Sequence, residues 1–206
     1  GEISLAHRGV LFLDEFPEFP RNVLEALRQP MEDGVVTIAR AAGSLTFPAK
    51  FILVAASNPC PCGYLGDPAR PCRCLPGQVQ RYQKRISGPI LDRIDLHLDV
   101  PAVKVEKLVT VQLRQGSAGQ AENSRRIKAK VQKARDIQTK RFKDTKLKNN
   151  AEMFTKEVRY FCRLSSECLT LMRQATTQMN LSARSYYRVI KVARTIADLA
   201  GEKAIK

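Results

Sequence analysis

The stretch Gly9-Val10-Leu11-Phe12-Leu13-Asp14-Glu15 decides the fold, because four large apolar residues run without alternation into two acids. An uninterrupted apolar run predicts a strand that is buried on both faces of a parallel sheet. Ligands of such sheets gather just outside the carboxyl ends of the strands. The two acids therefore fall where a ligand is expected to bind.

These two acids suit two different tasks at the edge of a sheet. Asp14 is a candidate ligand of Mg²⁺, which takes oxygen ligands and keeps several of its waters. Glu15 is a candidate for polarising a water that attacks a γ-phosphate. The alternative is a strand that ends in a solvated acidic turn, and the rest of the chain must decide between the two interpretations.

A second buried strand is predicted over residues 51–56, which are again apolar and run into the polar pair Ser57-Asn58. The segment between the two strands predicts a helix over residues 20–32 and a β-hairpin over residues 36–47, with Arg40 near the tip of the hairpin. Two buried strands that are joined through a helix and a hairpin indicate an α/β fold with a parallel sheet.

The remaining elements of the first half are shorter. The helix over residues 20–32 is predicted from apolar residues on one face, namely Val23, Leu24, Leu27 and Met31. Pro30 is expected to distort or end this helix. A helix is predicted over residues 76–85, a helical turn over residues 90–95, and a strand over residues 96–100, where apolar and polar residues alternate.

The second half of the chain predicts only helices. Their first or capping residues are Ser124, Phe154, Ser165 and Ser182. Apolar stripes are expected on the first and last of these helices, at Ile127, Val131, Ala134 and Ile137 and at Tyr186, Val189, Ala193, Ile196 and Ala200. Gly201 suits the end of the last helix. The sequence thus predicts an α/β domain over residues 1–101 and an all-α domain over residues 102–206.

The charge of the chain is distributed unevenly between these two halves. The formal net charge is +15, with 35 Lys and Arg and 20 Asp and Glu. Residues 1–101 hold 11 basic and 11 acidic side chains, which leaves 24 basic and 9 acidic ones for residues 102–206. This asymmetry indicates that the second domain faces a polyanion, or else that it has a solvated basic surface.

The composition also indicates where in the cell the protein is expected. The chain begins with Gly1 and reaches an apolar strand within ten residues, which favours a fragment of a longer protein. No signal peptide and no apolar run long enough to span a bilayer occurs in the sequence. A cytoplasmic location is therefore expected, where disulfides are not the default.

Two polar residues could complete the chemistry that the first acids begin. If the two predicted strands are neighbours, the amide of Asn58 can bond to the attacking water or to the γ-phosphate, although an Asn-Pro turn is the simpler interpretation. The guanidinium of Arg93 is of the kind that stabilises charge on a transferred phosphoryl group, often from a neighbouring subunit. The alternative for Arg93 is a salt bridge to Asp92 or Asp95.

Arg184 is unusual because it follows the Ser182 cap, in the first turn of the last helix. A cation at that position opposes the helix macrodipole. A nucleotide phosphate at the start of the helix would interact favourably with both the dipole and the Arg184 side chain. The alternative is an ion pair with an acid of the other domain.

The order of these segments resembles that of an AAA+ ATPase. The segments similar to Walker B, sensor 1, the arginine finger and sensor 2 are residues 9–15, 55–59 (AASNP), 91–95 (LDRID) and 181–184 (LSAR). The predicted hairpin resembles the insertion before sensor 1 that magnesium chelatase and MCM helicases share. The motifs NPCPCG, RPCRC, RISGPILDRIDLHLDVP and LSARSYYRVIKVARTIADL resemble, more narrowly, the magnesium chelatase-related ComM (YifB) family.

The resemblance covers nearly the whole chain and implies an ATP- and Mg²⁺-dependent hexameric DNA motor that promotes branch migration in natural transformation. It implies that residues 1–101 are part of an AAA+ core and that residues 102–206 are its helical lid. The glycine-rich P-loop of the family, with its Lys and Ser/Thr, occurs nowhere in these 206 residues. The sequence is therefore expected to hold the hydrolysis and sensing half of the site and not to hydrolyse ATP alone.

Four cysteines are spaced as C-x-C-x9-C-x-C, namely Cys60, Cys62, Cys72 and Cys74. Four thiolates suit tetrahedral Zn²⁺, and the glycines and prolines between the two pairs would let the loop fold back on itself. Free thiols or adventitious disulfides are the alternatives.

A basic segment over residues 124–148 holds eleven Lys and Arg residues against two acids. Five of them lie off the apolar stripe of the predicted helix: Arg125, Lys128, Lys133, Arg135 and Lys140. DNA phosphates are a candidate partner for this face, and Arg40 on the hairpin is the alternative contact. Two rival functions remain open: a chelatase-type ATPase that acts on a metal-insertion partner, and a non-catalytic zinc-containing DNA-binding module.

Overall fold

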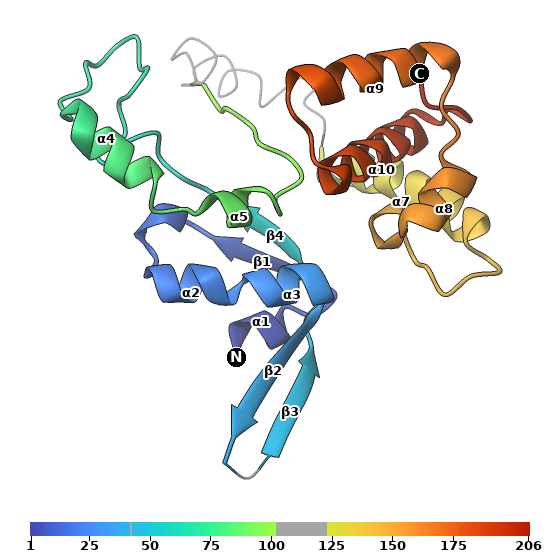
Figure 1. Ribbon diagram of the computed structural model, residues 1–206, viewed down its shortest axis with the longest axis horizontal. Helices are drawn as coiled ribbons and strands as arrows, with labels where there is room; N and C mark the ends of the chain where they lie inside the picture. Colours follow the sequence, from blue (N-terminus) through green and yellow to red (C-terminus); the bar gives the residue numbers. More distant parts are fainter. Residues whose placement is uncertain (42, 102–122) are drawn as a thin grey trace, which may run out of the picture. The chain divides into compact units, whose positions relative to one another are not determined.

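The computed structural model describes residues 1–41, 43–101 and 123–206. The chain divides into two compact units, Gly1–Ala102 and Val103–Lys206. The described residues of the first unit are mixed α/β, and those of the second are helical (Figure 1). Within the described ranges, no helix combines the length and the apolar character that crossing a membrane requires.

The first unit is built around two parallel strands, β1 (Val10–Leu13) and β4 (Ile52–Ala55). Their register runs from Val10 opposite Ile52 to Leu13 opposite Ala55. Both strands were predicted from their apolar runs, and their parallel pairing confirms that part of the sequence analysis. A short helix that the sequence analysis did not identify, α1 (Glu2–Leu5), precedes β1.

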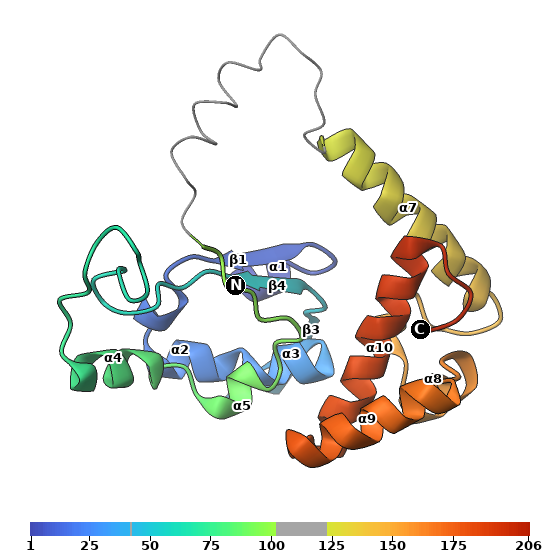
Figure 2. The same ribbon diagram turned by 90° about the horizontal axis from the view of Figure 1, so that it is seen from above.

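The core of this unit lies on one face of the two strands. The side chains of Leu11 and Leu13 pack on a buried cluster of Phe16, Leu24, Leu27 and Ile90. This cluster comes from the helical segments, and Figure 2 shows the longer ones on one side of the two strands. The alternate residues Val10 and Phe12 are 58% and 59% exposed. Burial on both faces was therefore the wrong expectation for the described residues, because their helical segments cover only one side of the pair.

The predicted helix over residues 20–32 is two helices, α2 (Arg21–Ala26) and α3 (Arg28–Asp33), which meet at Leu27. Pro30 lies inside α3. Since proline has no N–H to donate to the carbonyl four residues earlier, it weakens the helix at Ala26, where the break occurs. Leu24 and Leu27 are buried as expected, whereas Val23 is 45% exposed.

The predicted β-hairpin is present as β2 (Val35–Arg40) and β3 (Gly43–Pro48), which pair antiparallel with Thr37 opposite Thr46. The hydroxyl groups of these two threonines are 3.2 Å apart. Figure 1 shows the hairpin extending away from the rest of the first unit, and Arg40 lies at its far end, opposite Gly43. Arg40 is exposed.

Three helical segments complete the first unit: η1 (Phe16–Glu18), α4 (Pro76–Gln83) and α5 (Gly88–Leu91). Pro89 lies in the first turn of α5 and does not break it, because a helix start tolerates the missing N–H. The predicted strand over residues 96–100 is not formed, and Leu98 and Val100 are 82% and 88% exposed. A strand needs a partner, and none lies beside this segment in the described part of the chain.

The second unit is made of helical segments: α7 (Ser124–Arg141), η2 (Asn150–Glu152), α8 (Thr155–Phe161), α9 (Ser166–Gln178) and α10 (Ala183–Ala200). Its buried core is formed by Phe142, Met153, Val158, Cys162, Ile190 and Ile205. The side chains of Ser165 and Ser182 cap α9 and α10 as predicted, but Asn123, not Ser124, caps α7. Gly201 ends α10 with φ +74°.

The expected apolar stripe of α10 is only partly correct. Val189 and Ile196 are 42% and 61% exposed, whereas Arg194 and Asp198 are buried. Ile127 and Val131 on α7 are also exposed, and only Ala134 and Gln138 of that helix are buried. An apolar stripe does not predict this arrangement, because charged side chains are ordinarily expected on the solvent face of a helix.

Candidate functional site

The parallel pairing brings the predicted catalytic acids and Asn58 to the same edge of the sheet. Ala56 N donates to the Leu13 carbonyl at 2.9 Å, and Phe16 N donates to the Ala56 carbonyl at 2.9 Å. These two bonds hold the turn that carries Asp14 and Glu15 against the segment that leads into Asn58. The structure thus unites Asp14 and Glu15 with Asn58, which lies more than forty residues later in the sequence.

The turn after β1 has a constrained backbone. Glu15 adopts φ +49° and ψ +43°, the left-handed conformation that side chains other than glycine rarely take. Its N–H donates to Oδ1 of Asp14 at 2.9 Å, and the next residues, Phe16 and Pro17, are buried. The buried residues and the hydrogen bond hold both acids in an exposed position at the strand end.

Tyr82 on α4 is part of this edge and was missed in the sequence analysis. The residue is 6% exposed, and the backbone N–H of Asn58 donates to its hydroxyl oxygen. Burial raises the pKa of Tyr82, and the carboxylate of Glu18 adds to the shift. The neighbouring Gln83 donates from Nε2 to the Pro59 carbonyl at 3.3 Å. No local sequence pattern predicts that Tyr82 lies at this edge, because its partner Asn58 lies 24 residues earlier in the chain.

The four predicted metal-ligating cysteines come together in the loop between β4 and α4. The Sγ atoms of Cys60, Cys62, Cys72 and Cys74 all lie within 4.8 Å of one another, and all four cysteines are free. The three closest pairs are Cys60–Cys62 at 3.4 Å, Cys62–Cys72 at 3.6 Å and Cys60–Cys72 at 3.7 Å. Cys60 is fully buried and the other three are half-buried.

Backbone groups shape this cysteine loop and contact its sulfur atoms. Gly63 N donates to the Cys60 carbonyl at 3.0 Å, and Gly63 has φ +81°, which suits glycine at this turn. Backbone N–H groups of Tyr64 and Arg73 donate to the sulfur of Cys62 and lower its pKa to about 6. Burial raises the pKa of Cys74 to about 12.

Arg93 is paired within its own unit, with an acid that the sequence analysis did not consider. Its guanidinium forms an ion pair with Glu32 on α3 and donates to the Pro89 carbonyl at 2.6 Å. The side chain is 15% exposed. Arg93 therefore forms a salt bridge within its own unit, with Glu32 as a partner.

Arg184 and the basic candidates of α7 lie in the second unit, whereas the acids and Asn58 lie in the first. Arg184 is exposed in the first turn of α10, next to the cap in which Ser182 Oγ accepts from Ser185 N at 3.1 Å. All five predicted basic residues of α7 are exposed: Arg125, Lys128, Lys133, Arg135 and Lys140. Their exposure leaves them accessible to a polyanion.

A buried ionic network that no sequence pattern indicated joins the helices of the second unit. Asp198 accepts from Arg141 Nη1 at 2.7 Å, from Arg194 Nε at 3.1 Å and from Asn150 Nδ2 at 2.8 Å. The Asp198 side chain is 0% exposed. Burial alone would raise the pKa of Asp198, but the hydrogen bonds from Arg141 and Asn150 outweigh it, and the pKa is lowered. The network therefore holds an ionised carboxylate in the core.

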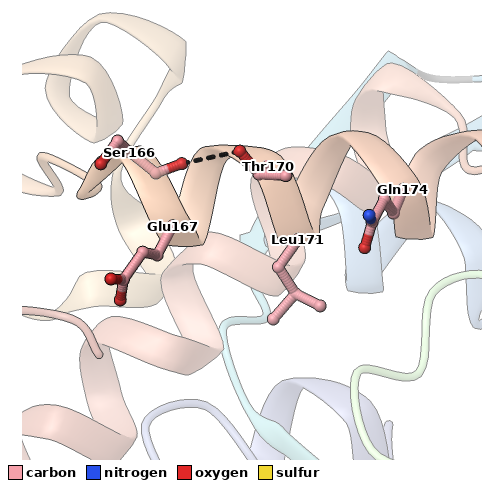
Figure 3. A pocket seen from close by; sticks show the side chains of 5 residues that line it. All are labelled: Ser166, Glu167, Thr170, Leu171 and Gln174. Atoms are coloured by element: carbon pink, nitrogen blue, oxygen red, sulfur yellow. Dashed lines mark hydrogen bonds between the residues drawn. The ribbon is translucent and has the colours of Figure 1, made fainter.

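A shallow surface depression of about 390 Å³ runs along α9 (Figure 3). It is lined by Ser166, Glu167, Thr170, Leu171 and Gln174. The Thr170 hydroxyl donates to the Ser166 carbonyl at 3.0 Å, and Leu171 is 65% exposed. None of the residues predicted to bind a nucleotide, metal or DNA lines this depression.

Comparison with known proteins matches both halves of the chain to parts of the same kind of protein. The family described as magnesium chelatase, subunit ChlI, matches residues 1–108, and the family of the C-terminal part of that subunit matches residues 121–206. The competence protein ComM of Haemophilus influenzae is 46% identical over 205 residues, which are 100% of this chain and 38% of that protein. YifB of Escherichia coli is 44% identical over 97% of this chain and 37% of its own length.

A more distant similarity covers part of the chain. The DNA replication licensing factor mcm-6 of Caenorhabditis briggsae is 31% identical over 96 residues, which are 47% of this chain and 11% of that protein. The chain spans less than two fifths of the length of the ComM and YifB proteins that it matches.

Proposed function

The chain belongs to the magnesium chelatase-related ComM/YifB family, and on this basis we propose that it forms part of an AAA+ ATPase that moves DNA. In this proposal residues 1–101 belong to the ATPase core and residues 102–206 form its helical lid. The full-length protein assembles as a hexameric ring in the cytoplasm and promotes branch migration during natural transformation.

The observation that carries the ATPase proposal is the shared edge of β1 and β4. There Asp14, Glu15 and Asn58 follow two hydrogen-bonded parallel strands. The exposed carboxylate of Asp14 offers the oxygen donors that Mg²⁺ takes, and a bound Mg²⁺ neutralises charge on the phosphates of ATP. Glu15 accepts a proton from, or orients, the attacking water, and Asn58 donates its amide to the γ-phosphate or to that water.

Two arginines complete the proposed site. Arg93 stabilises the charge that develops on the γ-phosphate in a neighbouring subunit, in exchange for its ion pair with Glu32. Arg184 binds a nucleotide phosphate at the start of α10, where the helix dipole favours an anion. Zn²⁺ on the four cysteines is proposed as a structural ion that takes no part in hydrolysis.

DNA is the favoured substrate for two reasons. The exposed basic face of α7 and Arg40 at the hairpin tip offer phosphate contacts. The names of two similar proteins also refer to competence and to DNA replication. A chelatase-type ATPase is the second candidate, because the matching family is named after a magnesium chelatase subunit.

ATP hydrolysis by the full-length protein, measured with and without DNA, tests the proposal. Stimulation by single- or double-stranded DNA is expected for a motor, whereas turnover that DNA leaves unchanged would favour the chelatase-type function. The 206-residue chain alone is expected to bind ATP weakly, because it has no glycine-rich loop of N–H donors. Micromolar binding in calorimetry would contradict that expectation.

A further inference from the structure

We infer that the four cysteines form a structural zinc site that holds Asn58 in place at the catalytic edge. The consequence for hydrolysis rests on the proposed function, whereas the metal site and its link to Asn58 do not.

The sulfur positions fit a tetrahedral ion. Four thiolates at the usual Zn–S distance of about 2.3 Å are separated from one another by about 3.8 Å. The three shortest Sγ–Sγ distances are 3.4, 3.6 and 3.7 Å, and the fourth cysteine is within 4.8 Å of the others. These separations are far longer than the roughly 2.05 Å of a disulfide.

The state of the cysteines also suits ligation by zinc. All four are free thiols, Cys60 is buried, and the other three are half-buried. Four sulfur ligands with no open position are typical of structural zinc rather than of a catalytic ion.

The cysteine loop folds on itself by its own polar contacts. Asp67 Oδ1 accepts from Ala69 N at 2.7 Å and from Arg70 N at 3.2 Å. Arg70 in turn donates to the Tyr64 hydroxyl at 3.0 Å. The loop has few buried apolar side chains, since Cys60 is its only fully buried residue among those described. A metal ion is therefore the component that would stabilise it most.

The link to the catalytic edge is short. Asn58 lies two residues before Cys60, and its N–H donates to the hydroxyl of Tyr82. The Pro59 carbonyl accepts from Gln83 Nε2. Tyr82 and Gln83 both belong to α4, which begins two residues after Cys74. The cysteine site would thus hold together both ends of the loop that joins β4 to α4, and Asn58 lies at the start of this loop. Figure 1 shows the path of the loop between these two elements.

The 206-residue chain tests the metal site directly. Elemental analysis of protein purified without chelator should find one zinc per chain, and Co²⁺ exchange should give the visible absorption bands of tetrahedral cobalt thiolate. Loss of a ligand in Cys62→Ser should weaken binding by more than the roughly 10–100-fold that loss of an outer hydrogen bond costs. Cys168→Ser is the matched control, because Cys168 lies on α9, outside the cluster. Zinc-free protein with four freely titrating thiols would overturn the inference.

Amide hydrogen exchange tests the link to Asn58. The N–H groups of Asn58 and of Gly63, which donates to the Cys60 carbonyl, should exchange faster after chelation of zinc and in Cys62→Ser, and should remain protected in Cys168→Ser. Trypsin should likewise cut the Arg73–Cys74 bond faster in the metal-free chain, while Arg70, which precedes a proline, stays uncut. Exchange at Asn58 that is independent of zinc would overturn the link even if zinc is bound.

In the full-length protein, Cys62→Ser should retain ATP binding and lose hydrolysis in proportion to the zinc lost. Full hydrolysis by zinc-free Cys62→Ser would overturn the catalytic consequence. A wild-type protein that binds zinc and protects Asn58 but does not hydrolyse ATP would contradict the proposed function and leave the zinc site standing.

Discussion

At the scale of single residues, the molecule places its polar groups in two kinds of environment. Asp14 and Glu15 are exposed at a strand end, where a ligand can reach them. Asp198, in contrast, is completely enclosed and accepts hydrogen bonds from two arginines and an asparagine. The first pair suits chemistry and the buried carboxylate suits stability, so substitutions at the two places should be distinguishable.

The first prediction concerns Glu15 in the full-length protein. Glu15→Gln keeps the size of the side chain and removes its ability to accept a proton from water, so ATP binding should persist while hydrolysis falls to background. Nucleotide binding by calorimetry and phosphate release measure the two effects. Glu18→Gln is the control, since Glu18 is paired with Arg85 and lies one turn further along the chain. Normal turnover in Glu15→Gln would exclude its role with water.

The second prediction concerns Asp198 and pH. The folded-state pKa of this carboxyl lies below its ordinary value of 3.8, so its contribution to stability is fully present above about pH 4 and is lost as pH falls through the folded-state pKa. Asp198→Asn should lower the free energy of unfolding near pH 7 by about 3–5 kcal/mol, because two buried arginines lose their charged partner.

Urea unfolding followed by circular dichroism at several pH values measures this difference. The gap between wild type and Asp198→Asn should narrow below pH 4, whereas the exposed Asp136→Asn on α7 should show little gap at any pH. A constant gap down to pH 2 would mean that the carboxylate charge is not the stabilising feature.

At the scale of elements, α7 has a side that packs in the second unit and a side that is basic and exposed. Its C-terminal half packs through Ala134 and Gln138, and Arg141 at its end joins the buried network. Its other basic side chains are exposed. A helix of this kind can contact a polyanion without any change in the core.

The third prediction follows from the basic face of α7. Changing Lys128, Lys133 and Lys140 to Glu in the full-length protein should weaken DNA binding and reduce the slope of log affinity against log salt by about 0.9 for each phosphate that is no longer neutralised. The charge-matched control changes Lys156, Arg163 and Lys203 to Glu. These three residues are exposed in the same unit. If the two triple variants lost the same amount of DNA affinity, the effect of the α7 substitutions would come from the net charge of the protein and not from contacts of this helix.

At the scale of the whole molecule, the proposed function requires an active site that combines residues of two subunits. Glu15 belongs to the edge of the parallel strands, whereas Arg93 follows α5 and is paired with Glu32 in its own subunit. If Arg93 acts on the phosphate of a neighbouring subunit, its ion pair with Glu32 must first break. Its contribution to the rate is expected to be about 10³–10⁵-fold.

The fourth prediction uses mixed rings of full-length protein. Glu15→Gln and Arg93→Ala should each be nearly inactive, but a mixture should recover part of the activity, because some sites combine an intact Glu15 with a neighbour's intact Arg93. Glu32→Gln should retain most of the activity if Arg93 acts on phosphate, and should be as damaging as Arg93→Ala if only the ion pair matters. Mixed rings that remain inactive would refute the assignment of Arg93 to a neighbouring site.

Local patterns by themselves determined much of this protein. Apolar runs predicted β1 and β4, alternation predicted the hairpin, and the capping residues Ser165 and Ser182 located two helix starts, because each depends on neighbouring residues only. The spacing of four cysteines also predicted their cluster. Such features are set by backbone geometry and by local hydrogen bonds, which the sequence expresses directly.

The tertiary structure alone decided the pairings between distant residues. It joined Tyr82 to Asn58, Arg93 to Glu32, and Asp198 to Arg141. It also left residues 96–100 without a strand partner and one face of β1 exposed among the described residues. These outcomes depend on which surfaces come into contact when the chain folds. The free energy of burying or pairing a group is set by those tertiary contacts and not by the local sequence.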